Sequence, residues 1–166
     1  MTNNKHQKNM KKTFLSAMLL CALSACSSSD EDEKDMTQPE IVATDTASPL
    51  DCDTYHKGGK IPFSYLFKDN QELGSYNIEI HNNFDHHTHS TSAVECSLNA
   101  VKEAQKPWVF NRDFSIPGGL KSYDASMEID VPTDIDVGNY HFMVRLTDKA
   151  GWQQIKSVAI KIVEAE

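Results

Sequence analysis

Four of the seven histidines in the chain lie within nine residues, at positions His81, His86, His87 and His89. Imidazole nitrogen is a good ligand for Zn, Cu, Fe and Ni, so a tract of this density indicates a candidate transition-metal site. Along an extended loop, alternate side chains point the same way. His87 and His89 can therefore reach one ion, whereas His86 is expected to point away.

Two predicted strands would position this tract. Residues 75–81 alternate between apolar inward residues and polar outward ones, and they end on an outward His81. Residues 140–147 form the most regular predicted strand, and His141 points outward there because both of its neighbours are apolar. In an immunoglobulin-like sandwich these would be the third and sixth strands, which are antiparallel neighbours. His81 and His141 should then lie side by side, with Cβ atoms roughly 4.5–5.5 Å apart if directly opposed.

The predicted metal site combines this pair with the loop. Zinc takes four tetrahedral ligands, with nitrogen at about 2.0–2.1 Å, and a thioether ligand would shift the preference toward copper. The expected cofactor is therefore Zn or Cu. The predicted ligands are His81, His87, His89 and His141, with Asp85 and His86 as substitutes and with Met143 and Glu79 as adjoining donors. The alternative is a solvated polar loop whose histidines bind nothing.

Two short catalytic signatures overlap the tract, and neither holds. Asp85-His-His87 resembles part of a phosphoesterase signature, but that family needs further Asp motifs and a much longer α/β chain. His87-Thr-His89 begins like the metallo-β-lactamase motif, but Thr91 and Ser92 stand where its Asp and His would follow. No general acid–base pair or nucleophile is visible in the rest of the sequence. We therefore predict that the protein is not an enzyme.

The remaining pattern is that of an all-β domain. Short segments with β character are separated by turn residues, and they predict an immunoglobulin-like antiparallel β-sandwich of about seven strands. These segments are residues 41–46, 61–67, 75–81, 108–116, 125–131, 140–147 and 155–163. Tyr140 stands where such sandwiches place a tyrosine corner. Residues 49–59 are predicted to form a loop, and 82–107 a long loop with a short helical turn between 92 and 105.

Two cysteines remain in the predicted domain, Cys52 and Cys96. In an exported protein two such cysteines most often pair, and this disulfide would tie the histidine loop to the segment before residue 61. Closing a loop of this size would stabilise the fold by about 4 kcal/mol in the entropy model. The alternative is a thiolate metal ligand.

The N-terminus reads as an export signal. Residues 1–25 combine four lysines, a short apolar run and an exit of small residues, which is typical of a secretory signal peptide. The apolar run is too short for a membrane-spanning helix of ~20 residues. Its end, Leu23-Ser-Ala-Cys26, resembles the bacterial lipoprotein signal, so Cys26 is the predicted lipidation site and the membrane the predicted anchor. The alternative is an ordinary secreted protein.

Residues 26–38 are predicted to be a disordered acidic tether, and residues 39–166 the sandwich domain. Three serines and then five acidic residues follow Cys26, and such a run is solvated rather than packed. The run also resembles the surface-export signal of Bacteroidota lipoproteins, which predicts exposure on the outer surface of the outer membrane; a periplasm-facing anchor is the alternative. Removal of the four signal lysines leaves 12 basic and 24 acidic residues, a charge of −12 that argues against nucleic-acid binding.

Specific strings in the domain carry a family resemblance. They are Asp69-Asn, Ser75-Tyr, Ile80-His-Asn-Asn-Phe-Asp-His-His-Thr-His89 and Gly138-Asn-Tyr-His-Phe142. Over residues 39–163 the chain resembles a family of Bacteroidota lipoproteins catalogued as domain of unknown function 4625. The resemblance implies an immunoglobulin-like lipoprotein with recurring histidines at the positions of His81, His87, His89 and His141, and it implies no established activity.

These observations predict a lipid-anchored envelope protein that binds a transition metal in metal capture or handling. The alternative function is an adhesive or structural immunoglobulin-like module that binds a protein or glycan. The predicted partners are the membrane, through the lipid on Cys26, and an envelope protein.

Overall fold

The computed structural model describes residues 34–89 and 96–165, and within them the chain forms eight β-strands and no helix. The strands are β1 (Glu40–Val42), β2 (Thr54–His56), β3 (Lys60–Lys68), β4 (Leu73–Asn82), β5 (Phe110–Ser115), β6 (Ser122–Asp130), β7 (Gly138–Asp148) and β8 (Gln153–Val163). The predicted all-β sandwich is confirmed. None of the described residues belongs to a helix that is long and apolar enough to cross a membrane.

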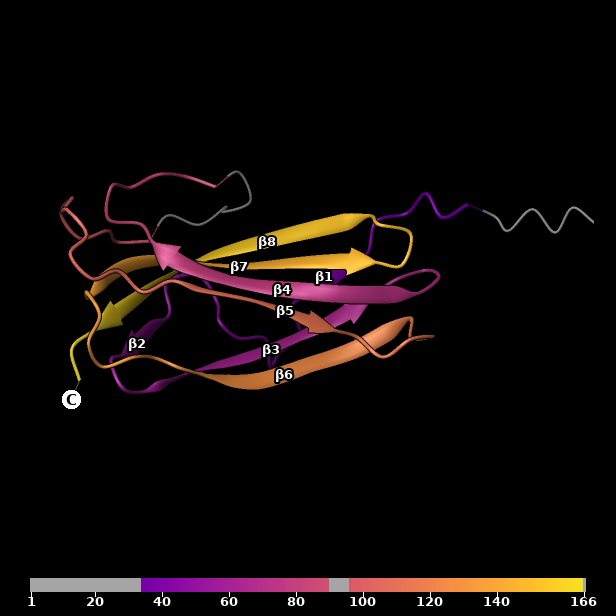
Figure 1. Ribbon diagram of the computed structural model, residues 1–166, viewed down its shortest axis with the longest axis horizontal. Coiled ribbons are helices and arrows are strands. Elements are labelled where there is room, and N and C mark those ends of the chain that lie inside the picture. The colour runs from indigo at the N-terminus through magenta and orange to yellow at the C-terminus, as the bar shows by residue number, and fades with distance from the viewer. Residues whose placement is uncertain (1–33, 90–95, 166) are drawn as a thin grey trace, which may run out of the picture. The chain divides into compact units, whose positions relative to one another are not determined.

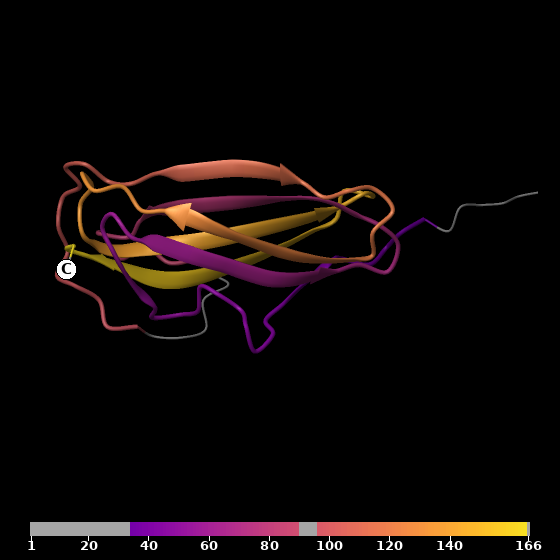
Figure 2. The same cartoon turned by 90° about the horizontal axis from the view of Figure 1, so that it is seen from below.

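The strands form two packed sheets (Figure 1). One sheet has the order β1-β3-β6 and the other β2-β8-β7-β4-β5. Seen from below, β3 and β6 cross in front of the longer strands of the five-stranded sheet (Figure 2). All neighbours are antiparallel except β2 and β8. As predicted, the third and sixth of the expected strands, β4 and β7, lie side by side.

Alternate side chains of the long strands form the core between the sheets. The predicted alternation of residues 75–81 is observed, with Tyr76, Ile78 and Ile80 buried. From the opposite sheet Phe63 stacks on Phe142, with 5.9 Å between ring centroids. Aromatic burial of this kind carries much of the stability of a small sandwich.

A tyrosine corner fixes the start of β7. The Tyr140 hydroxyl donates to the carbonyl of Asp136 at 2.6 Å, and the Trp108 backbone N–H donates to the same hydroxyl at 3.2 Å. This confirms the position predicted for Tyr140. The residue after this anchor is His141, so the sandwich holds one of the predicted ligands on a rigid part of its frame.

Besides shifts of at most three residues at the other strand ends, three features differ from the sequence prediction. Residues 49–59, predicted to be a loop, contain β2, which pairs in parallel with the end of β8. A strand of three residues between turn-forming residues is too short to show an alternating pattern in the sequence. β2 is therefore recognised only from its pairing with β8. The first strand ends at Val42 rather than at residue 46. Residues 96–105 form no helical turn, while residues 90–95 lie outside the described part of the chain.

The N-terminal predictions fall outside the described residues. The signal peptide, the lipidation site Cys26 and most of the tether lie within residues 1–33. The last residues of the predicted tether are described, and there Asp35 is buried rather than solvated.

Candidate metal centre

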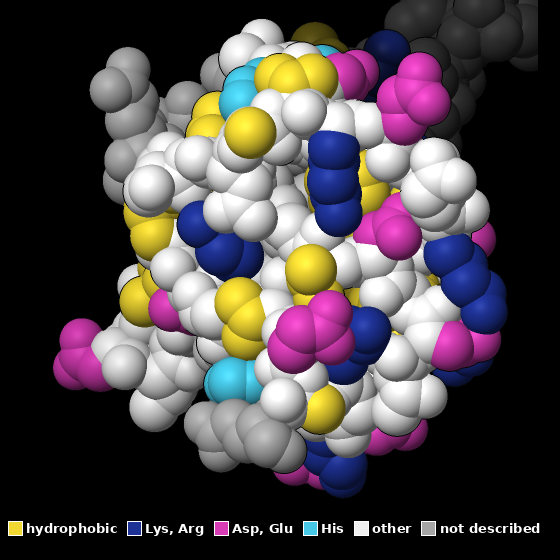
Figure 3. Space-filling view, turned by 90° about the vertical axis from the view of Figure 1, so that its left-hand side faces the viewer, with side chains coloured by type: hydrophobic (Ala, Val, Ile, Leu, Met, Phe, Trp, Pro, Cys, Tyr) yellow, Lys and Arg dark blue, Asp and Glu magenta, His cyan; other side chains and the backbone are white. Residues whose placement is uncertain are grey.

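His81 and His141 are cross-strand neighbours. They are directly paired in the register of β4 and β7, and their ring centroids lie 5.5 Å apart. The sequence predicted this pair from the inward positions of the flanking apolar residues. The pair lies where β4 ends and β7 begins, and at this end of the molecule histidine surface is visible between charged and apolar side chains (Figure 3).

The loop after β4 is bound to the start of β7. The Asn83 backbone N–H donates to the Asn139 carbonyl at 2.8 Å, which extends the strand ladder by one bond. The buried Phe84 packs edge-on against Tyr140, with centroids 5.3 Å apart. Gly138 has φ +137°, and a Cβ there would come within 2.9 Å of the Phe84 ring. Glycine therefore lets the ring approach, and Phe84 holds the loop against the sandwich.

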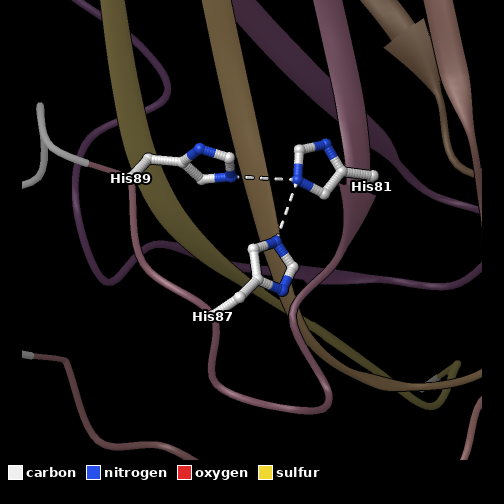
Figure 4. A group of neighbouring side chains, drawn as sticks. All are labelled: His81, His87 and His89. Atoms are coloured by element: carbon white, nitrogen blue, oxygen red, sulfur yellow. Dashed lines mark hydrogen bonds between the residues drawn. The ribbon is translucent and has the colours of Figure 1, made fainter.

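Three histidine side chains converge above this end of the sheet (Figure 4). The Nε2 atom of His81 lies 3.1 Å from Nε2 of His89 and 3.3 Å from Nε2 of His87. One nitrogen of each ring lies within 4.8 Å of the other two, which is close enough to hold a single ion. Nitrogens bound to one tetrahedral zinc at 2.0–2.1 Å lie about 3.3–3.4 Å apart. The observed spacing is close to that of a zinc ligand set.

Carboxylates lie beside the outer nitrogens of two of these rings. Asp85 Oδ1 accepts a hydrogen bond from His87 Nδ1 at 2.6 Å, and this bond lowers the pKa of the Asp85 carboxyl. Glu79 Oε1 lies 3.1 Å from His81 Nδ1, at ion-pair distance but without hydrogen-bond geometry. A carboxylate on Nδ1 favours the tautomer whose Nε2 lone pair faces the cluster. Asp85 and Glu79, predicted as a substitute ligand and an adjoining donor, are thus placed to orient the ligands.

His141 lies against the cluster, but its Nε2 contacts the backbone of the loop, whereas the Nε2 atoms of the other three rings face one another. It is 4% exposed, and its Nε2–H donates to the backbone carbonyl of His87 at 3.1 Å. Burial lowers the pKa of His141 to about 4, because the charged ring would lose its hydration. Its Nδ1 is buried and has no hydrogen-bond partner. The structure therefore places the predicted fourth ligand beside the other three, holding the loop that carries two of them.

His86 lies away from the convergence point, and Met143 lies further along β7 than His141. His86 has a left-handed backbone, φ +62°, and its Nε2 lies 2.8 Å from the Asn99 carbonyl, as the expectation that it points away requires. Met143 pairs with Glu79, one same-face position further along the sheet than the His81–His141 pair.

Burial is the main cause that lowers the pKa of His89, and the charges of His81 and His87 lower it further. A neutral ring binds metal without first losing a proton.

The cysteines form a disulfide that ties down the far side of the loop. Cys52 and Cys96 are bonded, with Cα atoms 5.3 Å apart and a sequence separation of 44. The Cys52 backbone N–H donates to the Ala159 carbonyl on β8 at 2.8 Å. Both sulfurs are consumed by the bond, so neither is available as the thiolate ligand that the sequence left open.

A family profile and three solved structures are similar to this chain. The profile described as "Domain of unknown function (DUF4625)" matches residues 24–163. No curated protein matches the sequence. The structure of OgpA from Akkermansia muciniphila is 19% identical with a TM-score of 0.44, over 76% of this chain and 30% of that one. The GspB Siglec domain is 16% identical with a TM-score of 0.41, over 79% of this chain and 60% of that one.

The third structure is Spo0M, a sporulation control protein from Bacillus subtilis. It is 11% identical with a TM-score of 0.42, over 78% of this chain and 49% of that one. The chain thus spans less than two thirds of each of these three proteins. Similarities this distant carry no argument about function.

Proposed function

The chain belongs to the family described as domain of unknown function DUF4625, and since that description assigns no activity, we propose from the geometry of the site that the protein binds a transition-metal ion, Zn or Cu. The ligands are His81, His87 and His89. One observation carries the proposal, namely the 3.1 Å and 3.3 Å spacing of their Nε2 atoms. Without an ion, three imidazole nitrogens facing one another can share at most two hydrogen bonds.

The donor set limits the metal. Three imidazole nitrogens suit Zn and Cu better than Mg or Ca, which take oxygen ligands. Met143 is not counted among the ligands, because its place in the register is opposite Glu79, one same-face position beyond the His81–His141 pair. His141 remains the predicted fourth ligand, and in that role its Nε2 would leave the His87 carbonyl that it now contacts. Otherwise water or a partner's side chain completes the four positions.

The exposure of the site is compatible with capture or handling of a metal. His87 is 37% exposed at its side chain and His81 20%, so an ion can enter from solvent. We further propose that the protein is a Bacteroidota-type lipoprotein, anchored through Cys26 and displayed on the cell surface. Protease treatment of intact cells tests the display, and complete protection of the protein would contradict it.

Calorimetric titration with Zn and with Cu tests the metal site. The material is the mature chain from residue 26, carrying Cys26→Ser to prevent lipidation and no polyhistidine tag. We expect binding of one equivalent, with His87→Ala and His89→Ala each lowering the affinity at least tenfold. His86→Ala is the matched control from the same loop, because its ring faces Asn99, and it should bind as the parent does. Affinities weaker than about 1 mM for both metals, or about −4 kcal/mol, would reject the proposal.

The same variants address the alternative function. If His87→Ala loses binding to a protein or glycan partner while a saturating chelator is present, the loop serves adhesion rather than metal binding.

A further inference from the structure

Three carboxylates gather at the opposite end of the β4–β7 pair, and we propose that Asp35, Asp69 and Asp148 form a calcium site. One oxygen of each lies within 4.8 Å of the other two. Asp69 starts the turn between β3 and β4, Asp148 is the last residue of β7, and Asp35 precedes β1. The segment before β1 approaches the sandwich at this end, where the β7 arrow terminates (Figure 1).

Local backbone groups fix one oxygen of each carboxylate. Asp69 Oδ1 accepts from the N–H groups of Gln71 and Glu72, at 2.8 and 2.7 Å. Asp148 Oδ1 accepts from the Trp152 N–H at 2.8 Å. These bonds close the two turns and hold the carboxylates in place before any ligand arrives.

Asp35 is held in the same way by its own segment and by the β3–β4 turn. Its Oδ1 accepts from the Thr37 N–H at 3.0 Å and from the Asn70 side-chain amide at 3.1 Å. Its backbone carbonyl accepts from the Trp152 indole N–H at 2.9 Å. The segment is thus seated between the two turns that supply the other carboxylates.

The second carboxylate oxygens of Asp69 and Asp148 are the evidence that a ligand binds here. Both Oδ2 atoms are inaccessible to solvent and have no hydrogen-bond partner, and Asp148 as a whole is only 4% exposed. Asp35 is 6% exposed. Among the residues that the structure describes, no Lys, Arg or His nitrogen lies within 4.0 Å of these three carboxylates. Buried carboxylates of like charge are costly unless a cation neutralises them.

The donor chemistry selects a hard cation. All three side chains offer oxygen, which Ca²⁺ and Mg²⁺ prefer and which suits zinc or copper less well. Oxygens bound to one Ca²⁺ at 2.3–2.6 Å lie at most about 5 Å apart, which accommodates the observed grouping. Calcium tolerates an irregular shell completed by water or backbone carbonyls, whereas Mg²⁺ demands near-ideal octahedral geometry. Three carboxylates on separate segments fit calcium better.

The site would couple the N-terminal segment to the fold. Asp69 and Asp148 belong to the sandwich, whereas Asp35 lies outside its strands. An ion shared by all three ties residues 35–39 to the end of the domain. If Cys26 is the anchor proposed above, calcium would thereby fix the domain end of the tether at Asp35.

Calcium titration of the same Cys26→Ser mature chain tests this inference, after the chain has been freed of metals with a chelator. We expect one Ca²⁺ to bind in or below the range of about 0.1–1 mM that extracellular modules show. The amides of Thr37 and Trp152 should exchange more slowly with calcium than without it. Mg²⁺ should bind more weakly.

Asp148→Asn should weaken calcium binding at least tenfold, since it keeps the Oδ1 acceptor but removes the charge. Asp35→Asn, outside the strands, provides a second variant should Asp148→Asn fail to fold. Asp124→Asn, an exposed acid on β6, is the matched control and should bind as the parent does. Zinc titration of each variant monitors the histidine site separately. Any of three results would overturn the proposal: no saturation by about 10 mM Ca²⁺, undiminished binding in both Asp148→Asn and Asp35→Asn, or Mg²⁺ binding tighter than Ca²⁺ binding.

Discussion

The two ends of the β4–β7 pair carry donor groups of different chemistry. β4 begins at Leu73, next to the Asp69 turn, and reaches His81 eight residues later, while β7 runs back from His141 to Asp148. At about 3.3 Å per residue the two ends lie on the order of 26 Å apart. One end presents imidazole nitrogens and the other presents carboxylate oxygens. Because of this distance, the two proposed cation sites would share no ligand, and we expect them to bind independently.

The ends also differ in what holds their donors. The carboxylates sit on tight turns and a seated segment, each bonded by nearby N–H groups. The histidines His87 and His89 sit on a long loop that depends on distant contacts: Phe84 on the core, the His141 bond to the loop carbonyl, and the disulfide beyond. The histidine end should therefore be the more easily disturbed.

Removal of the disulfide should produce the largest difference between the two ends. Cys52→Ser with Cys96→Ser opens a loop of 44 residues and should lower the free energy of unfolding by about 4 kcal/mol. Zinc affinity should fall with it, while calcium affinity should stay within about twofold, because neither Cys52 nor Cys96 belongs to the turns or the segment that carry the aspartates. Urea denaturation and the two titrations measure these changes. Equal losses at both ends would mean that the sandwich as a whole, and not the loop alone, relies on the bond.

Acidification of the metal-free protein should act next most strongly, through His141. Its pKa is about 4 in the folded chain and about 6.5 when unfolded, so below pH 6.5 the unfolded chain binds a proton that the folded chain refuses. This group's effect is absent at pH 7, grows as the pH falls, and reaches about 3 kcal/mol of lost stability near pH 4.

The variant His141→Gln isolates this effect. Glutamine can still donate to the His87 carbonyl but does not titrate, so the stability difference between parent and variant should shift by about 3 kcal/mol between pH 7 and pH 4. Urea denaturation of both proteins in chelator at several pH values measures it. Parallel pH curves for the two proteins would show that His141 is not buried as a neutral ring.

The histidine end was largely predictable from sequence, whereas the aspartate end was not. The alternation of residues 75–81 and 140–147 fixed which side chains face outward, and the fold class then placed His81 opposite His141. Sequence reasoning missed that Asp85 and Glu79 lie beside the Nδ1 atoms of His87 and His81. A carboxylate close enough in sequence to bind the metal is also close enough to orient a histidine ligand, so the spacing does not separate the two roles. Phe84 was missed too, although a lone aromatic residue in a polar tract was a usable signal.

The aspartates could not be grouped from sequence because they come from three segments that only the tertiary structure brings together. Asp35 was assigned to a solvated run by its acidic neighbours, and nothing local distinguishes it from them. Its burial depends on the Trp152 indole and the Asn70 amide, both far away in the chain. Likewise β2 exists only because the end of β8 offers it a pairing edge.

Neutralisation of the carboxylate behind His87 should have a smaller effect, confined to the histidine end. Asp85→Asn removes the charge that holds His87 Nδ1 at 2.6 Å, and loss of such an outer partner typically costs about 10–100-fold in metal affinity. Stability should barely change because the Asp85 side chain is 72% exposed. Zinc titration at pH 7 checks the expectation, with calcium affinity as the internal reference. Unchanged zinc affinity would remove Asp85 from the site.

The smallest effect is expected for the carboxylate behind His81, and it distinguishes two ways of orienting a ligand. Glu79 Oε1 is 3.1 Å from His81 Nδ1 but lacks hydrogen-bond geometry, and His81 is already fixed by its place on β4 opposite His141. Glu79→Gln should therefore lower zinc affinity by less than the about tenfold minimum typical of outer-partner loss. A loss as large as that of Asp85→Asn would mean that Glu79 forms a full hydrogen bond once metal binds. A histidine on the rigid strand needs less support than one on the loop, because the sheet already determines where its ring points.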